Sequence, residues 1–273
     1  MPTFRKKRLL SRTLMSLVAG VVVVAACDTT ASFSPSQQRW GFVYLAALRS
    51  AGGEYRIAPT AYFFRGSVTS VPDARVRTDS CFVAGEYVAP TSGGINGATY
   101  LDAGASITAT LGSSANVIPR ISGSSATTYG LASGVTVAHR PGDSVVVTVP
   151  GASGGFPASE LRGRSAEPFT IDPILPSTNA IPLRWTAATD NNSALLVSLQ
   201  YTPSTAGAKT QEIRCAFTDD GLDSIPARQH LAWSAASNRD RAIVVTRLRT
   251  AFVNVEGGVM ELISTLQLPT PTP

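Results

Sequence analysis

The chain has 273 residues, of which 44% are apolar and 15% are charged, a balance that excludes an intrinsically disordered protein. Its three cysteines are too few for a disulfide-rich scaffold, and its two histidines leave little material for a zinc site. Five of the 23 basic residues lie within the first twelve positions, and the remaining 18 balance the 18 acidic residues. The net charge of +5 therefore gives no reason to expect nucleic-acid binding.

The N-terminus has the three parts of a secretory signal peptide. A basic run, Arg5–Arg8, is followed by an uncharged run, Leu14–Ala26, that ends in small residues. This order predicts export, because export signals combine a basic segment, a short apolar segment and a small-residue cleavage site. The thirteen residues of the uncharged run would rise only about 20 Å as a helix, which is too short for a bilayer core of roughly 30 Å.

The end of this signal, Val24-Ala25-Ala26-Cys27, resembles the lipobox of bacterial lipoproteins. The resemblance implies cleavage before Cys27, a diacylglycerol on its sulfur and an acyl chain on the new amine, with no other cofactor. Two or more such chains anchor a protein stably, whereas one gives marginal binding. We therefore predict a signal peptide at 1–26 and a lipidated flexible tether at 27–39. The open alternatives are an ordinary signal peptide with an incidental cysteine and an uncleaved N-terminal helix.

Beyond the tether the pattern is that of β-strands. Short runs rich in Val, Ile, Thr and aromatic residues alternate with Gly, Pro, Asp and Asn, which predicts an all-β fold of one or two antiparallel β-sandwich lobes behind the cleaved signal peptide. One helix is expected at Pro226–Ser234, with proline at its first position. Two hairpins are expected, around residues 51–54 and 140–143. The expected strands are, in chain order, Trp40–Leu48, Tyr55–Phe64, two pieces of Arg75–Val88, Ile107–Leu111, Val135–His139, Ser144–Val149, Pro168–Ile171, Pro182–Thr186, Ala194–Tyr201, Gln211–Phe217, Arg241–Phe252 and Val259–Leu268.

A glycine-rich segment at 151–164 suggests a boundary between two β-sandwich domains, at 40–155 and 160–268. The second domain has an immunoglobulin-like arrangement, in which Trp185 on an early strand packs in the centre and Cys215 follows on a later strand. Only this second cysteine lies within the domain, so the topology is similar at best. The alternative is one interlocked sandwich assembly without a clean boundary.

The layout of the folded part resembles that of uncharacterised secreted β-sandwich lipoproteins. The segments that carry the resemblance are Pro141–Val149, Leu183–Thr186 and Arg214–Gly221. It implies a fold and no activity. Beyond the last strand, the proline-rich residues 269–273 are expected to form a disordered tail, because proline lacks the amide that helices and sheets require.

Cys81 and Cys215 remain if Cys27 carries lipid. Both lie in apolar, strand-like segments, and an exported protein folds in an oxidising compartment, so a disulfide between them is one alternative. It would close a loop of more than 130 residues. The other alternative is a pair of buried free thiols, since free cysteine is among the most buried residue types.

Ser153 lies in a G-x-S-x-G motif, Gly151–Gly155, which in hydrolases presents a nucleophile between a strand and a helix. His230 lies downstream and would be the base of such an enzyme. Two further glycines and Pro157 follow the serine and would break the helix that the motif needs, which favours a glycine-rich loop. The hydrolase remains an alternative.

Asp219, Asp220 and Asp223 gather after a predicted strand and are the one candidate metal site, for calcium. Calcium needs six to eight oxygen ligands and the pattern supplies too few, which favours a turn stabilised by aspartate side chains. Neither His139 nor His230 has a second ligand at zinc spacing, so both are expected to be packing or exposed histidines.

Arg247 and Arg249 share one face of a predicted strand, because side chains two residues apart point to the same side of a sheet. We expect this face to be exposed to solvent, and the alternative is a surface for an anionic partner. Aromatic residues are only 7% of the chain, so composition gives no special support to carbohydrate binding.

These observations predict a non-catalytic, lipid-anchored protein of the cell envelope, on the periplasmic or outer side, that presents a β-sandwich for protein or ligand binding. Its expected partners are the membrane, through the lipid on Cys27, and a protein, but no nucleic acid. One alternative is an accessory structural subunit, outside the bilayer on the periplasmic side, of a larger membrane complex. The other is an envelope serine hydrolase that uses Ser153 and His230.

Overall fold

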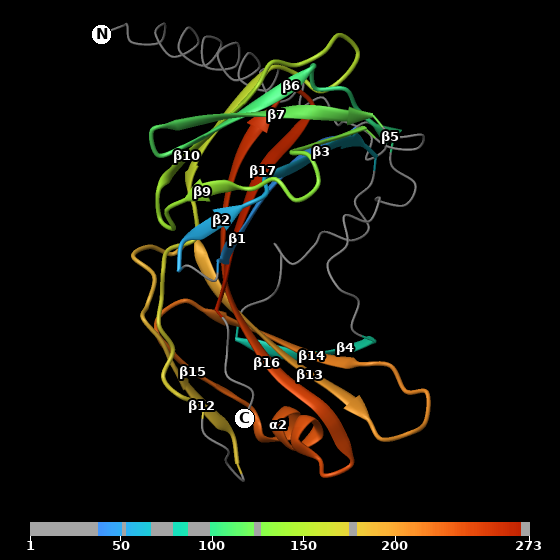
Figure 1. Cartoon of the computed structure of the whole chain (residues 1–273), viewed down its shortest axis with the longest axis vertical. Coiled ribbons are helices and arrows are strands. Elements are labelled where there is room, and N and C mark those ends of the chain that lie inside the picture. The colour runs from blue at the N-terminus through green and yellow to red at the C-terminus, as the bar shows by residue number, and fades with distance from the viewer. Residues whose placement is uncertain are drawn as a thin grey trace, which may run out of the picture. The chain divides into compact units, whose positions relative to one another are not determined.

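Figure 1 shows a computed structural model of the chain, which describes residues 38–50, 53–66, 79–86, 99–122, 127–174 and 179–268. The predicted signal peptide, Cys27, the tether up to residue 37 and the tail at 269–273 lie outside these residues. Within the described part, no helix combines the length and the apolar character that crossing a membrane requires.

Strands make up almost all of the regular structure, which confirms the prediction of an all-β fold. The one helix of the described residues is α2 (Ala227–Ser234). The strands are β1 (Arg39–Arg49), β2 (Tyr55–Ile57), β3 (Thr60–Arg65), β4 (Ser80–Glu86), β5 (Thr99–Tyr100), β6 (Ser106–Leu111), β7 (Ser114–Ser122), β8 (Thr127–Gly130), β9 (Val137–His139), β10 (Ser144–Val149), β11 (Ser159–Arg164), β12 (Ile181–Arg184), β13 (Ser193–Pro203), β14 (Gln211–Thr218), β15 (Leu222–Ile225), β16 (Asn238–Val255) and β17 (Gly258–Leu268).

Most of these strands belong to one continuous hydrogen-bonded sheet. Its order is β11-β10-β6-β7-β8-β3-β1-β17-β16-β13-β14-β4, with β5 beside β3 and with β2 between β1 and β9. Strands β12 and β15 form a separate two-stranded sheet. Among the described strands, β1 and β17 pair in parallel and the other pairs are antiparallel.

The sheet bends back on itself, so that its two halves pack face to face as in a sandwich. A Cβ added to Gly163 of β11 would lie 2.9 Å from the Cβ of Ala251 on β16, so the two strands pack directly on each other. The rings of Phe63 and Phe156 meet across the same interior, with centroids 4.6 Å apart. The alternating residues of β10 show why this layer forms, because Val145, Val147 and Val149 are buried while the residues between them are not.

Strands that precede the segment 151–164 pair with strands that follow it. Strand β1 pairs with β17 near the C-terminus, and β4 pairs with β14. Strand β16 has 18 residues and pairs with β13 over one part of its length and with β17 over another. The chain from Pro35 onward forms one compact unit. Strand pairs thus link the parts of the chain on both sides of 151–164.

Of the two predicted hairpins, the first is confirmed and the second is wrong. Strands β1 and β2 pair in antiparallel fashion, and the amide of Ser50 donates to the carbonyl of Glu54 at 2.7 Å. Strand β9 pairs with β2, however, while β10 pairs with β6 and β11. The turn between β9 and β10 still forms, with the amide of Asp143 donating to the carbonyl of Arg140 at 3.2 Å. Strand β10 pairs with β11 over six residues, whereas β9 has only three residues with which to pair.

The predicted helix is confirmed as α2, although Pro226 is its N-cap residue and not its first helical residue. It buries His230 and Trp233, and the indole nitrogen of Trp233 donates to the carbonyl of Gln200 at 2.9 Å. The expected burial of Trp185 is also confirmed, since 7% of this residue is exposed and its ring lies 6.4 Å from that of Phe217.

Candidate functional site

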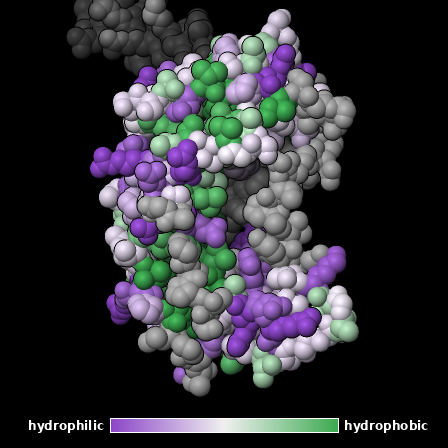
Figure 2. All heavy atoms as spheres, in the orientation of Figure 1, coloured by the Kyte–Doolittle hydropathy of each residue, from purple (hydrophilic) through white to green (hydrophobic). Residues whose placement is uncertain are grey.

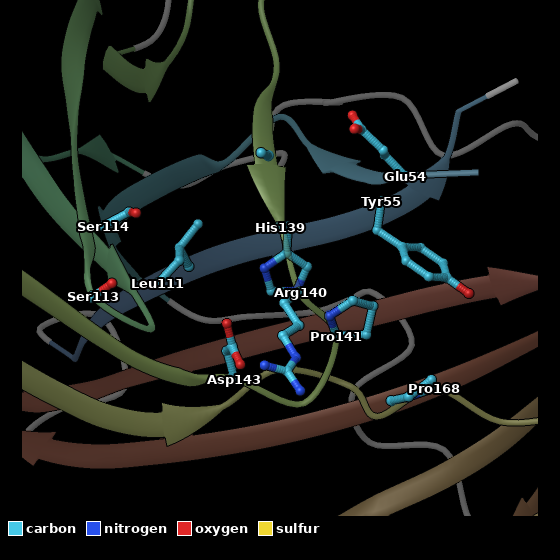
Figure 3. A pocket seen from close by; sticks show the side chains of 11 residues that line it. Glu54, Tyr55, Leu111, Ser113, Ser114, His139, Arg140, Pro141, Asp143 and Pro168 are labelled. Atoms are coloured by element: carbon cyan, nitrogen blue, oxygen red, sulfur yellow. The ribbon is translucent and has the colours of Figure 1, made fainter. Parts of the chain in front are cut away.

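A pocket of about 630 Å³ lies where three turns converge at one end of the sheet (Figure 3). The turns are those between β1 and β2, between β6 and β7 and between β9 and β10, and the segment after β11 closes the lining. Loops held by a rigid sheet are a common position for binding residues. The lining residues are Glu54, Tyr55, Leu111, Ser113, Ser114, Ala138, His139, Arg140, Pro141, Asp143 and Pro168.

His139 occupies the middle of this pocket. Figure 3 shows its imidazole between the serines of the β6–β7 turn and the ring of Tyr55, which pairs with His139 across β2 and β9. The residue is 9% exposed, and neither ring nitrogen has a hydrogen-bond partner. Burial lowers the pKa of His139 below its ordinary value of 6.5, and the nearby carboxylate of Asp143 offsets only part of this effect. The imidazole is therefore neutral at neutral pH.

The pocket exists because β9 and β10 join different neighbours. At Arg140–Asp143 the chain turns from β9, which pairs with β2, into β10, which pairs with β11. His139 is the last residue of β9 and therefore lies at this corner. Arg164 holds this corner by donating two hydrogen bonds, of 3.0 and 2.8 Å, to the carbonyl of Gly142. Gly112 leaves room for the carboxylate of Asp143, since a Cβ at Gly112 would lie 2.9 Å from it.

The other polar side chains of the pocket are equally without protein partners among the described residues. None of the hydrogen bonds or ion pairs found there involves the side chain of Glu54, Ser113, Ser114, Arg140 or Asp143. Glu54 and Arg140 are exposed, and Asp143 is half-buried. The site thus offers two carboxylates, one guanidinium and the hydroxyls of two serines to a visiting molecule, while the ring nitrogens of His139 are buried beneath its surface.

Ser153 and His230 are not brought together. The loop that carries Ser153 leads into β11, whose first residue contacts Met260, the partner of Val253 on β16. His230 lies in α2, which packs against β16 near Arg241. Twelve residues of strand, or about 40 Å at roughly 3.3 Å per residue, separate these two parts of β16. A nucleophile and its base need hydrogen-bond contact.

The glycines around Ser153 have a packing role. A Cβ at Gly155 would lie 2.0 Å from the carbonyl oxygen of Asp102, and one at Gly151 would lie 2.4 Å from the amide nitrogen of Ala158. The chain continues from this loop into β11 and not into a helix. Close approach of two backbone segments therefore explains the G-x-S-x-G pattern without a nucleophile.

Asp219, Asp220 and Asp223 do not converge on one point. Asp219 is buried and accepts a hydrogen bond of 2.7 Å from the indole of Trp185. Asp220 accepts from the backbone amide two residues on, and Asp223 from the next amide, at 3.2 and 2.6 Å. These are the local bonds of an aspartate turn. In the part of the chain that the structure describes, no three His, Cys, Asp or Glu side chains form a group that could hold a metal ion.

The prediction of a solvent-exposed arginine face on β16 is wrong. Arg247 is fully buried and Arg249 is 4% exposed. The Nε of Arg247 lies 2.7 Å from Asp219, and Arg249 pairs with Glu167 at 3.1 Å and with Asp190. Their acidic partners come from three distant loops, which the alternation along one strand could not reveal.

Glu167 is the carboxylate that pairs with Arg249. Burial by itself raises the pKa of Glu167, but hydrogen bonds from Thr189 and the cations Arg249 and Arg164 outweigh it, so the pKa lies below its ordinary value of 4.5. The carboxylate is therefore charged at neutral pH, as its partner requires. This cluster holds loops together.

Cys81 and Cys215 are joined by a disulfide, with an S–S distance of 2.00 Å. The two residues lie opposite each other on neighbouring strands, β4 and β14, whereas the bridge of immunoglobulin domains joins two sheets. Strand β4 is the last strand of the large sheet, so the bridge fastens an edge strand. Its role is structural.

The described residues thus define an all-β, sandwich-like protein with a polar pocket at one end of its sheet. No model of a known protein family matches the chain, and no curated protein matches its sequence.

Proposed function

We propose that this chain is a lipid-anchored protein of the cell envelope that binds a ligand without transforming it. The observation that carries the binding role is the pocket beside His139, where several polar side chains have no protein partner among the described residues. A few polar side chains that line a hollow and are not bonded to the protein can bond and orient a ligand there.

The lack of an assembled catalytic contact supports binding over catalysis. Neither ring nitrogen of His139 accepts a hydrogen bond from Ser113 or Ser114, although both serines line the same pocket. Ser153 lies in the loop before β11, whereas His230 lies in α2. An activated nucleophile needs a base within hydrogen-bond reach, and neither histidine hydrogen-bonds to a serine of the described residues.

The distribution of apolar residues on the face drawn in Figure 2 favours a separate binding protein over a subunit of a larger complex. Figure 2 shows the apolar residues of the visible face in separate groups, with polar residues between them. A subunit held by protein contacts would present a larger continuous apolar patch. The exposed large apolar side chains are spread over several elements, at Leu48, Phe82, Val83, Val117, Ile121, Val135, Leu222, Leu231 and Phe252.

The membrane anchor rests on the N-terminal pattern that ends at Cys27. Attachment to a surface raises the effective concentration of a binding protein near ligands of that surface without any new contact. A binding body with balanced charge suits this role, because it needs no electrostatic attraction to the membrane once the lipid holds it.

The anchor is tested by producing the full chain in a bacterium and measuring the intact mass of the protein extracted from its membranes. We expect a chain that begins at Cys27 and carries the mass of a diacylglycerol and an acyl chain. The Cys27→Ser variant is the matched control and should lose both. A wild-type protein that retains residues 1–26, or that is released from the membrane after cleavage, would contradict the anchor.

The absence of catalysis is tested on the same extracted protein with a panel of chromogenic esters. We expect no turnover above that of a buffer blank. Turnover that disappears in Ser153→Ala, or in Ser113→Ala/Ser114→Ala, would show a serine hydrolase and overturn the proposal. If the protein is lipid-anchored and does not hydrolyse the esters, crosslinking in native membranes followed by mass spectrometry would identify its binding partner.

A further inference from the structure

We propose that Arg65 and Arg39, at the end of the sheet where β1 begins, bind the phosphate group of an anionic ligand. This site is distinct from the pocket beside His139, which lies at the other end of β1, and it goes beyond the proposed function. The inference follows from the free donors of Arg65, from the residues that lie beside it in the sheet and from the chemistry of the anions that could fit them.

The first argument concerns Arg65, which is half-buried and has no acceptor among the described residues. Its Nε is buried without a partner, whereas its two terminal nitrogens, which form no hydrogen bond either, keep contact with solvent. A guanidinium whose inner nitrogen is packed in place and whose terminal donors are free is prepared to bind an anion. The other buried or half-buried arginines of the described residues all bond to an acceptor, namely Arg39, Arg56, Arg214, Arg247 and Arg249.

The second argument concerns the residues on either side of Arg65. Arg39 lies directly opposite it on β1, and Thr99 lies directly opposite it on β5, the strands being neighbours of β3 in Figure 1. Residues directly opposite each other point to the same face of a sheet, with Cβ atoms about 4.5–5.5 Å apart. Strand β17 adds no side chain to this row, because Gly258 is the residue opposite Arg39. The row therefore holds two cations and one hydroxyl, and no carboxylate.

The two cations of this row are not compensated by an acid of the described residues. Arg39 donates to the backbone carbonyl of Glu256 at 3.2 Å, but the exposed carboxylate of Glu256 forms no ion pair there. Like charges directly opposite each other destabilise a strand pair. The next row of the same face is apolar, with Phe63 opposite Gly41, and water that is kept away from one side screens charges less. A bound anion would replace the repulsion by attraction.

The third argument concerns the kind of anion. A phosphate monoester carries a charge of about −1.5 to −2 at neutral pH and has three free oxygens. One such group balances both guanidiniums and accepts hydrogen bonds from both arginines and from the hydroxyl of Thr99. A carboxylate has one charge and two oxygens, so it leaves one cation without a counter-charge. The planar fork of arginine also matches phosphate oxygens in pairs.

The phosphate group could belong to a free compound or to a lipid headgroup. Cys27 and Arg39 are twelve positions apart, which an extended chain spans with at most about 40 Å. If Cys27 carries lipid, as proposed, the headgroups of the anchoring membrane lie within that distance of the site. Only the lipid source depends on the proposed anchor.

The test uses the full chain, extracted in a non-ionic detergent and kept in a buffer without phosphate. Isothermal titration calorimetry is run with inorganic phosphate, with dihexanoyl phosphatidic acid as a soluble lipid phosphate, and with dihexanoyl phosphatidylcholine and acetate as controls. We expect the two phosphate probes to bind saturably and the two controls to bind at least about tenfold more weakly. Tighter binding of phosphatidic acid than of inorganic phosphate identifies the lipid source, and the reverse order identifies the free one.

Variants then place the binding at the two arginines. Arg65→Gln and Arg39→Gln should each weaken phosphate binding at least about tenfold. Arg162→Gln is the matched control, because Arg162 is an exposed arginine of β11 that pairs with Glu160 at 2.7 Å, and it should bind as the wild type does.

Thermal unfolding gives a second readout that does not depend on heats of binding. Saturating phosphate should raise the midpoint of the wild type and of Arg162→Gln, because a ligand of the folded state stabilises it, and should leave that of Arg65→Gln unchanged. Without phosphate, Arg65→Gln should unfold at or above the temperature of the wild type, because the variant loses one of two repelling charges.

Three results would overturn the inference. Failure of both phosphate probes to bind would remove the site, and phosphate binding that is equal in Arg65→Gln, Arg39→Gln and the wild type would place it elsewhere. Acetate that binds as tightly as phosphate would show that the class of anion is wrong. The mass of the mature chain and the ester assay decide separately on the proposed lipid-anchored, non-catalytic protein, and the titration with inorganic phosphate is independent of both.

Discussion

Arg247 and Asp219 form an ion pair inside the protein, with the arginine Nε 2.7 Å from a carboxylate oxygen and with 0% and 1% of the two side chains exposed. The indole of Trp185 donates to the same carboxylate at 2.7 Å, and the guanidinium lies 4.7 Å from the centre of the Phe169 ring. The contact ties β16 to the turn that follows β14. A buried charge of this kind is tolerated only while its partner is present.

We expect Asp219→Asn to lower the free energy of unfolding by about 3–5 kcal/mol, because it leaves the guanidinium of Arg247 buried without a counter-charge. Equilibrium unfolding in urea measures this loss. Asp220→Asn removes a carboxylate from the neighbouring exposed turn and serves as the matched control, with an expected loss below about 1 kcal/mol. Equal losses in the two variants would show that the buried pair does not matter for stability.

We expect the bridge between Cys81 and Cys215 to contribute up to about 5 kcal/mol, because it closes a loop with a sequence separation of 134 residues in the unfolded chain. The double variant Cys81→Ser/Cys215→Ser should show this loss in urea, and dithiothreitol should destabilise the wild type but not the variant. Cys27→Ser is the control, since this cysteine takes no part in the bridge. A wild type insensitive to the reductant under unfolding conditions would contradict the bridge.

We expect His139 to titrate below the ordinary value of 6.5, because burial lowers its pKa more than Asp143 raises it. The chain has two histidines, so an NMR titration of the imidazole protons gives two curves, and His230→Gln assigns them.

The same pKa has a consequence for stability. The unfolded chain binds a proton at His139 more readily than the folded one, so this residue makes unfolding easier as the pH falls below 6.5 towards the folded pKa. His139→Phe should remove that part of the pH dependence of the urea midpoint. A His139 curve centred at or above 6.5 would contradict both expectations.

We expect Gly155→Ala to cost about 3 kcal/mol, at the upper end of ordinary overpacking, because its Cβ would lie 2.0 Å from the carbonyl oxygen of Asp102. Gly154→Ala should cost about 1 kcal/mol, since Gly154 has a φ of 71° but open space around it. Ser153→Ala, in the same loop, should change stability by less than about 0.5 kcal/mol. Thermal unfolding of the three variants compares them, and the reverse order of Gly155→Ala and Gly154→Ala would refute the packing role.

Local patterns in the sequence predicted much of the fold. The hairpin of β1 and β2, the helix α2 and the burial of Trp185 follow from turn residues, a proline and strand alternation, all of which act over a few residues. The pairing of β9 with β2 was missed, because a turn signal shows that the chain reverses and does not show which strand lies beside it. The burial of Arg247 was missed, because alternation places side chains on one face without saying what covers that face.

The candidate site was the least predictable part. His139 looks like an ordinary histidine at the end of a strand, and none of its pocket neighbours forms a motif with it. The sequence by itself determined that this chain forms strands and where it turns, because strand alternation and turn chemistry depend on adjacent residues. Only the tertiary structure decided that turns drawn from Glu54 to Pro168 surround one unpartnered imidazole, because the choice among strand partners depends on packing between residues far apart in the chain.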